Sequence, residues 1–157
     1  MSLRRAREND LPAIAAVQQS AYAGNRAILG VEPLPLLADY AAVLASHEVW
    51  LADGRDGLAG VLILKAEPDH LLIWSIAAAP SMQGRGLGNR LLAEVEARAR
   101  ELGLHRLRLY TGEPLTKNIA WYERHGFVRE RVEALSDRRI VHMTKQLVAL
   151  ADGGRAR

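Results

Sequence analysis

The chain has 157 residues, of which 49% are hydrophobic and 25% are charged, so its composition excludes an intrinsically disordered protein and its length suits one domain with a sizeable core. The formal net charge at pH 7 is +3, from 21 Lys and Arg residues against 18 Asp and Glu residues, an excess too small to indicate nucleic-acid binding by itself. The sequence contains 0 cysteines, which excludes disulfide bonds, thiolate metal sites and a cysteine nucleophile.

The pattern of hydrophobic and turn-forming residues predicts a mixed α/β domain over residues 1–148, followed by a flexible tail at 149–157. In chain order we expect a strand at 2–6, a helix at 11–22, a loop at 24–35, a short helix at 36–45, strands at 47–52, 58–66 and 70–79, a helix at 87–102, a strand at 105–110, a short helix at 114–124, and strands at 127–133 and 138–146.

The centre of the chain predicts a strand–helix–strand unit. The segment HLLIWSIAAAP, which starts at His70, is too apolar to be half exposed, so we expect a central strand buried on both faces and ended by Pro80. Apolar residues at helical spacing then predict the longest helix, and Gly103 is placed to end it. The two strands of such a unit are parallel and their crossover is right-handed. We expect antiparallel strands on either side of it.

The loop between this strand and helix, PSMQGRGLGN at 80–89, has three glycines at alternate positions. Successive backbone N–H groups at a helix N-terminus form an anion site, and glycine lets a phosphate approach closely. An ordinary strand-to-helix turn is the alternative. A P-loop would need a lysine after its last glycine, where Asn89 stands, and a dinucleotide fingerprint would need a glycine at that same position.

Two motifs resemble those of the GNAT superfamily, the acyl-coenzyme A dependent N-acetyltransferases. QGRGLG, with Gln83, Gly86 and Gly88, is similar to its QxxGxG signature, and NIAWYERHGF at 118–127 is similar to a second signature further along. The resemblance extends over residues 2–147. It implies an α/β fold (an α+β mixed sheet) with an N-terminal strand and two helices, antiparallel strands, a central parallel unit splayed for coenzyme A, and a C-terminal helix with antiparallel strands.

The resemblance also implies a binding site for acetyl-CoA. Backbone N–H groups from Gly84 to Asn89 would hold the pyrophosphate, and the backbone of the alanine-rich strand end would pair with the pantetheine arm. The alternative for the alanines is packing under a helix. The implied coenzyme-binding residues are Ile76, Ala77, Ala78, Gln83, Gly84, Arg85, Gly86, Leu87, Gly88, Asn89 and Asn118.

Asn118 and Tyr122 are four residues apart on one predicted helix and therefore share a face. The resemblance implies that an amine attacks the acetyl carbonyl directly in a ternary complex and that Tyr122 gives a proton to the departing thiolate. A phenol is protonated at neutral pH and suits this role. A structural aromatic beside Trp121 is the alternative. For the base that would accept the amine proton, the candidates are a water chain to Glu32, Glu113 or His70, and each of these has a surface or structural role as its alternative.

The acceptor is a primary amine of unknown identity, either a small molecule or a peptide N-terminus. The irregular segment from Tyr22 to Tyr40, with Trp74 from the strand, is expected to form the wall that faces the acceptor, and the candidate substrate residues are Tyr22, Glu32 and Trp74. Glu32 with Asp39 favours a cationic acceptor, although a peptide N-terminus, a polyamine, an amino sugar and an amino acid all fit. A homodimer is possible, because dimers are common in the family. We expect a cytoplasmic enzyme with no membrane and no nucleic-acid partner.

Two other functions compete with catalysis. A non-catalytic acyl-CoA sensor would keep the coenzyme pocket, and a basic nucleic-acid-binding domain would use the arginines between Arg98 and Arg108. The intact QGRGLG and Tyr122 oppose the first, and the acidic residues among the arginines oppose the second. The five histidines show no ligand spacing, so we expect no metal.

Overall fold

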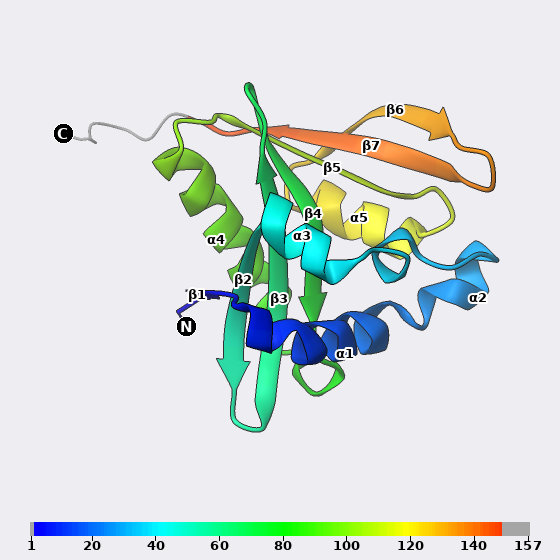
Figure 1. Ribbon diagram of the computed structural model, residues 1–157. Coiled ribbons are helices and arrows are strands. Elements are labelled where there is room, and N and C mark those ends of the chain that lie inside the picture. The colour runs from blue at the N-terminus through cyan, green and yellow to red at the C-terminus, as the bar shows by residue number, and fades with distance from the viewer. Residues whose placement is uncertain (1, 149–157) are drawn as a thin grey trace.

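Seven strands form one mixed sheet in the computed structural model, which describes residues 2–148 (Figure 1). The strands are β1 (Arg4–Arg5), β2 (Glu48–Gly54), β3 (Gly57–Ala66), β4 (Leu71–Ala78), β5 (Arg106–Gly112), β6 (Val128–Ala134) and β7 (Arg139–Gln146), in the sheet order β1-β2-β3-β4-β5-β7-β6. The helices are α1 (Leu11–Tyr22), α2 (Asn25–Leu29), α3 (Tyr40–Ser46), α4 (Leu87–Glu101) and α5 (Thr116–Arg124). Within residues 2–148 no helix is both long and apolar enough to cross a membrane. The predicted tail at 149–157 lies outside the described residues.

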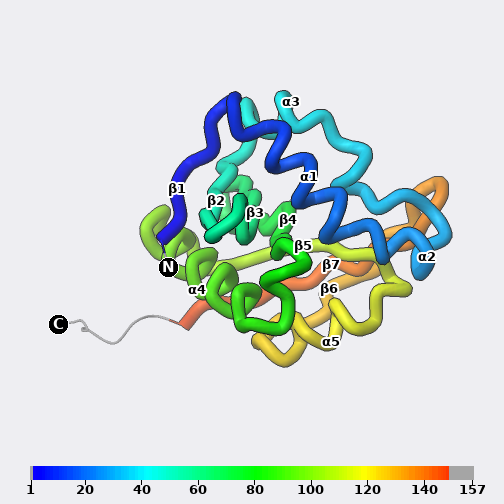
Figure 2. The backbone as a smooth tube through the Cα atoms, turned by 90° about the horizontal axis from the view of Figure 1, so that it is seen from below, coloured from blue at the N-terminus to red at the C-terminus, as the bar shows by residue number. Residues whose placement is uncertain are grey.

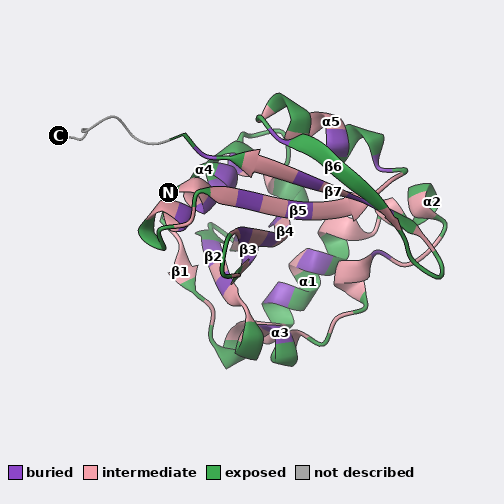
Figure 3. Cartoon of the chain, turned by 90° about the horizontal axis from the view of Figure 1, so that it is seen from above, coloured by how far each residue is buried: buried purple, intermediate pink, exposed green. Residues whose placement is uncertain are grey.

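Helices cover both faces of the sheet (Figures 2 and 3). On one face, α1 and α3 bury Ile14 and Val43 against β2, β3 and β4. On the other face, α4 buries an apolar stripe, and α5 adds Ile119 to the same cluster. The stripe on α4 consists of Leu87, Leu91, Leu92, Val95 and Ala99. The apolar residues that recur at helical spacing therefore form the face of α4 that packs on the core, as predicted from the sequence.

The segment at 24–35, predicted as a loop, contains the five-residue helix α2 and a 3₁₀ turn at 34–36. Gly24 and Gly30 flank the helix, and Gly30 ends it with a left-handed backbone (φ 75°). The next helix begins at Tyr40 rather than at residue 36. Asp39 fixes that start, because its Oδ1 accepts a hydrogen bond from the backbone N–H of Ala41 at 3.0 Å.

A β-bulge divides β4 into two halves. Ile73 pairs with Leu64 and Ser75 pairs with Ile63, so Trp74 is an extra residue on β4. Before the bulge, Ile73 packs in the cluster beneath α4, whereas Ala77 beyond it packs in the cluster beneath α1. Each residue of β4 is buried or half-buried. The expectation that neither face of this strand is exposed is therefore confirmed.

The parallel strands β4 and β5 stay paired only at their beginnings. Leu71 pairs with Leu107 and Leu72 with Arg108, after which the two strands separate. β5 continues alongside β7 as far as Gly112, so it is β4 that loses its neighbour. The second half of β4 consequently presents one backbone edge to an open gap, as the expected splay requires.

Candidate active site

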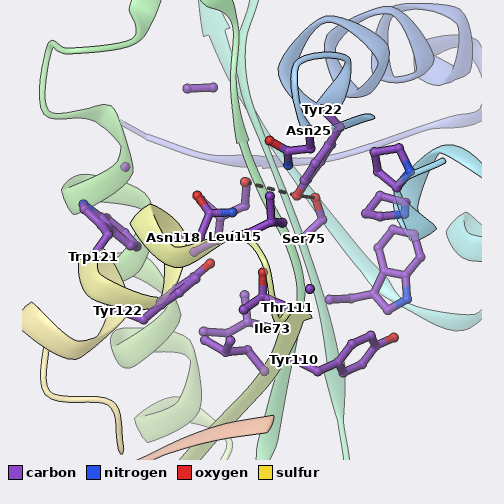
Figure 4. A pocket seen from close by; sticks show the side chains of 18 of the residues that line it. Tyr22, Asn25, Ile73, Ser75, Tyr110, Thr111, Leu115, Asn118, Trp121 and Tyr122 are labelled. Carbon is purple, nitrogen blue, oxygen red and sulfur yellow. Dashed lines mark hydrogen bonds between the residues drawn. The ribbon is translucent and has the colours of Figure 1, made fainter. Parts of the chain in front are cut away.

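A cavity of about 590 Å³ lies in the gap between β4 and β5 (Figure 4). Its walls come from the second half of β4, the end of β5, the loop before α4, one face of α5, the segment from Tyr22 to Pro35, and Arg138 in the β6–β7 turn. Of the residues predicted for the site, most line this cavity. They are Tyr22, Trp74, Ile76, Ala78, Gln83, Gly84, Gly86, Leu87, Gly88, Asn89, Asn118 and Tyr122.

The glycine loop forms one end of the cavity. Gly84 and Gly86 have left-handed backbones, with φ of 77° and 79°, which only glycine adopts at little cost. A Cβ built on either residue would have no neighbour within 4 Å. Among the described residues, the backbone N–H groups from Gly84 to Asn89 have no backbone acceptor. These N–H groups, together with the positive end of the α4 dipole, provide a site for an anion.

Gly88 has a second role that the sequence does not reveal. Its backbone is helical, but a Cβ there would lie 3.3 Å from Cζ2 of Trp121 on α5, so the glycine allows the two helices to approach closely. A hydrogen bond of 3.0 Å between Asn89 Oδ1 and His125 Nε2 joins the same two segments. The loop that begins α4 and the helix that carries Tyr122 therefore pack directly on one another.

The free edge of β4 is formed by Ile76 and Ala78. The backbone N–H of Ala79 donates to the carbonyl of Ala59 on β3 at 2.8 Å. Since successive residues of a strand direct their hydrogen-bonding groups to opposite sides, Ala77 also faces β3, and Ile76 and Ala78 face the gap. Both gap-facing carbonyls accept side-chain hydrogen bonds: Ile76 O from the Tyr22 hydroxyl and Ala78 O from Gln83 Nε2, each at 3.4 Å. The side chain of Ala77 packs with the α1 cluster and does not line the cavity.

Tyr122 stands on α5 on the side of the cavity opposite Tyr22 and Ser75 (Figure 4). Its ring packs edge-on against Phe127 and Trp121, with centroid distances of 5.4 and 4.9 Å. Among the described residues its hydroxyl has no hydrogen-bond partner. Burial, with a smaller contribution from Tyr22, raises the pKa of this phenol well above its ordinary value. Tyr122 thus presents a protonated, unpaired hydroxyl to the cavity at neutral pH.

A polar network crosses the other wall. Gln18 Nε2 donates to the hydroxyls of Ser75 and Tyr40, each at 3.0 Å, although Gln18 itself is fully buried. Ser75 Oγ lies 2.8 Å from the Tyr22 hydroxyl, and the Tyr40 hydroxyl donates to the carbonyl of Pro35. Burial raises the pKa of Tyr22 to about 12, although its hydrogen bond to Ser75 acts in the opposite direction. The network ties α1, α3 and β4 to the segment that forms this wall.

Two predicted residues do not line the cavity, besides Ala77. Arg85 belongs to the glycine loop but is exposed to solvent. Glu32 forms an ion pair with Arg26 at 2.5 Å, and Asp39 caps α3, so neither acid that suggested a cationic acceptor faces the cavity. The segment from Tyr22 to Pro35, expected as part of the acceptor wall, lines the cavity, whereas the sequence interpretation missed Tyr110, Thr111, Trp121 and Arg138. Only Trp121 had a local signal, as a neighbour of Tyr122 in the second motif.

The other sequence features find structural explanations. Arg98 pairs with Glu48 and Glu101, and Arg108 pairs with Glu130, so these arginines belong to ion pairs with acidic neighbours. Within residues 2–148, no three His, Asp or Glu side chains come together as metal ligands could. The polar and glycine-rich cavity is consequently the strongest candidate for the functional site.

Comparison with curated proteins finds relatives among N-acetyltransferases. The chain is 32% identical over 93 residues to an uncharacterized N-acetyltransferase, YvbK, of Bacillus subtilis, a match that covers 59% of this chain and 58% of that protein. It is 44% identical over 64 residues to an amino-acid acetyltransferase of Ralstonia nicotianae, which covers 41% of this chain and 13% of the other. The matches thus span about half of the first protein and an eighth of the second.

Solved structures share the fold. An acetyltransferase of the GNAT family from Desulfovibrio desulfuricans superposes with a TM-score of 0.75 at 23% identity, over 94% of this chain and 99% of the other. A GNAT family acetyltransferase from Elizabethkingia anophelis with acetyl-CoA bound gives a TM-score of 0.65 at 19% identity, over 93% and 97% of the two chains. The model of the acetyltransferase (GNAT) family matches residues 13–127. The chain therefore belongs to the GNAT family of acetyltransferases.

Proposed function

We propose that this protein transfers an acetyl group from acetyl-CoA to a primary amine by direct attack in a ternary complex. The observation that carries the proposal is the cavity between β4 and β5, which has unpaired backbone N–H groups at one end and the unpaired hydroxyl of Tyr122 on its wall. Membership of the GNAT family supports the reaction class.

The chain fits coenzyme A along the glycine loop and the free edge of β4. The N–H groups from Gly84 to Asn89 would donate to the pyrophosphate, and the space beside Gly84 and Gly86 is open. The backbone groups of Ile76 and Ala78 would pair with the pantetheine amides, much as an added strand pairs with a sheet edge. Asn118 on α5 would close the site from the opposite side.

Tyr122 would act as the general acid. Coenzyme A supplies an acetyl thioester, whose carbonyl carbon is attacked by the amine nitrogen before the carbon–sulfur bond breaks. Tyr122 then donates its phenolic proton to the departing sulfur, and water returns a proton to the phenolate before the next turnover. A phenol is protonated at neutral pH without any shift of its pKa. A backbone N–H of β4 at Ile76 or Ala78 would stabilise the oxyanion that forms.

The amine must reach the thioester without its extra proton. Among the described residues that line the cavity there is no Asp, Glu or His side chain, so the wall provides no ordinary base. We therefore propose that water accepts the amine proton and that the neutral amine is the reactive form. Turnover should accordingly rise with pH toward the pKa of the acceptor amine.

Following free-thiol release from acetyl-CoA in the presence of a panel of amines tests this function. Amine-dependent release together with a mass increase of the amine by one acetyl group is the expected result. Tight binding of acetyl-CoA in calorimetry without release for any amine would instead indicate a sensor, and the absence of both would reject the coenzyme site.

A further inference from the structure

Arg138 stands at the end of the cavity remote from the glycine loop. It belongs to the turn between β6 and β7, which lies beside α2 and away from the start of α4 in both Figures 1 and 2. Its side chain is only 6% exposed. Among the described residues that line the cavity, Arg138 is the one with a charged side chain. The charged group that this end presents to the cavity is therefore a cation.

Neighbouring groups hold the guanidinium in place. Nε and Nη2 of Arg138 donate to the two carboxylate oxygens of Asp137, each at 3.0 Å, and Nη1 donates to the backbone carbonyl of Glu32 at 2.7 Å. The bond to Glu32 connects residues 106 positions apart, so it fixes the β6–β7 turn against the segment between α2 and α3. Asp137 is 53% exposed and does not line the cavity.

Two N–H groups of Arg138 remain available for a further partner. A guanidinium has one N–H on Nε and two on each terminal nitrogen. These three bonds use the Nε hydrogen, one hydrogen on Nη2 and one on Nη1. One N–H is left on each terminal nitrogen, and two such donors are what a carboxylate accepts in a paired contact.

The rest of this end of the cavity is mostly apolar. Its side chains are those of Leu29, Pro33, Leu34, Pro35, Tyr110 and Ile140. A guanidinium that is paired with Asp137 and keeps two N–H donors toward such surroundings favours an anion as its next partner and opposes a second cation. Polyamines, which carry several positive charges, match this wall poorly, and amino sugars lack the anionic group that Arg138 would bind.

We infer that the acetyl acceptor is a small primary amine that also carries a carboxylate, with the carboxylate bound by Arg138 and an apolar substituent packed on the surrounding wall. The inference rests on the proposed acetyl transfer and names the class of its acceptor. It reverses the expectation of a cationic acceptor that Glu32 and Asp39 suggested.

The test compares amines that differ only in the carboxylate. Leucine and phenylalanine would be assayed against leucinamide, phenylalaninamide, isopentylamine and phenethylamine, with kcat/KM measured for each. The wild-type protein should prefer the amino acids to the matched amines that lack the carboxylate. Because a hydrogen bond to a charged group contributes about 1.5–3 kcal/mol, Arg138→Gln should lower this preference about 10-fold to 100-fold.

Arg139→Gln is the matched control. Arg139 is the next residue and the first of β7, is 57% exposed, pairs with Glu113 and does not line the cavity, so its loss should leave the preference for amino acids unchanged. Arg138→Lys retains the charge without the fork of donors and should give an intermediate preference. Thermal unfolding of each variant shows whether it is folded, and Arg138→Lys provides the comparison if Arg138→Gln is not.

The outcomes separate this inference from the proposed reaction. Acetylation of the amines without preference for the amino acids, or an equal loss of preference in Arg138→Gln and Arg139→Gln, would overturn the role of Arg138 while leaving acetyl transfer intact. Binding of leucine or phenylalanine to the coenzyme A complex in calorimetry, lost in Arg138→Gln but with no acetylation in wild type, would support the carboxylate site and reject the reaction. The absence of both binding and acetylation of the amino acids would overturn the inference.

Discussion

The two ends of the cavity are built in different ways. The glycine end consists of consecutive backbone N–H groups from Gly84 to Asn89, presented by one loop and the first turn of α4. The opposite end is assembled from side chains of separate segments, joined by long-range contacts such as the bond between Arg138 and Glu32. Backbone N–H groups are the same whatever the side chain, so they suit an anion such as the pyrophosphate of the proposed coenzyme. Side chains differ in shape and charge, so they can discriminate between acceptors.

Tyr122 lies between these two ends, and removal of its hydroxyl should have the largest effect on turnover. Tyr122→Phe should lower kcat by about 10²–10⁴, because a positioned acid is lost, while the affinity for acetyl-CoA stays near the wild-type value. The loss should be greatest below the thiol pKa of about 8.5, where the leaving group most needs a proton. Steady-state kinetics across this pH range, with calorimetry for the coenzyme, measures both effects. Turnover within about twofold of wild type would leave Tyr122 as a packing residue.

Gly86→Ala should weaken the glycine end alone. Forcing a side chain into the left-handed region costs about 1–2 kcal/mol, and the Cβ would occupy the open space where we propose that the pyrophosphate binds. Gly103→Ala is a matched control, because Gly103 has φ of 72° and equally open surroundings but lies at the other end of α4. Both variants should lose similar thermal stability, and only Gly86→Ala should lose acetyl-CoA affinity, by about tenfold or more in calorimetry. Equal affinities in the two variants would contradict a binding role for this loop.

Gly112→Ala should disturb the acceptor end instead. A Cβ at Gly112 would lie 2.5 Å from Cδ2 of Leu29, so α2 or the leucine tip must move. We expect a stability loss of about 1 kcal/mol, at the low end for overpacking because a leucine tip can rotate, and a raised KM for the acceptor with little change in coenzyme affinity. Adding Leu29→Ala to this variant should relieve the crowding. Failure of that rescue in denaturant unfolding would show that the contact does not limit α2.

Removing the hydroxyl of Tyr22 and removing that of Tyr122 should change the free energy of unfolding by different amounts. Tyr22→Phe deletes the bond to Ser75 and should cost about 1 kcal/mol at pH 7, whereas Tyr122→Phe deletes no bond and should change stability by less than about 0.5 kcal/mol. Because the folded-state pKa of both phenols is raised, to about 12 for Tyr22, the folded protein binds more protons than the unfolded chain above pH 10 and must lose stability there. Each Phe variant should reduce that alkaline loss. An unaltered slope of unfolding free energy between pH 10 and 11.5 would contradict the raised pKa values.

The contrast also explains what could be predicted from the sequence. The glycine loop, α4 and the position of Tyr122 follow from local patterns, namely glycine spacing, helical periodicity and two residues four apart. At the opposite end the irregular segment within 22–40 could be predicted as part of the wall, but the residues that meet it from β5 and from the β6–β7 turn follow from contacts between distant segments, for which no local pattern exists. In the sequence, Arg138 is indistinguishable from any polar residue of a hairpin turn, because its bond to Glu32 is formed only in the fold. Glu32 was predicted as a substrate residue because its pairing with Arg26 cannot be inferred from the sequence. The bulge at Trp74 could not be predicted either, because the residues before and after it are equally apolar and show no change of pattern.

The segment from residue 24 to residue 39 supplies much of the acceptor wall yet contributes little to the core, since Pro33 is the one buried residue in it. Substitutions in this segment should therefore change the free energy of unfolding less than substitutions in the buried sheet. Grafting a corresponding segment from another family member should thus transfer acceptor preference between proteins. The fold thus separates the proposed acetyl-CoA site on the glycine loop from the segment that would select the acceptor.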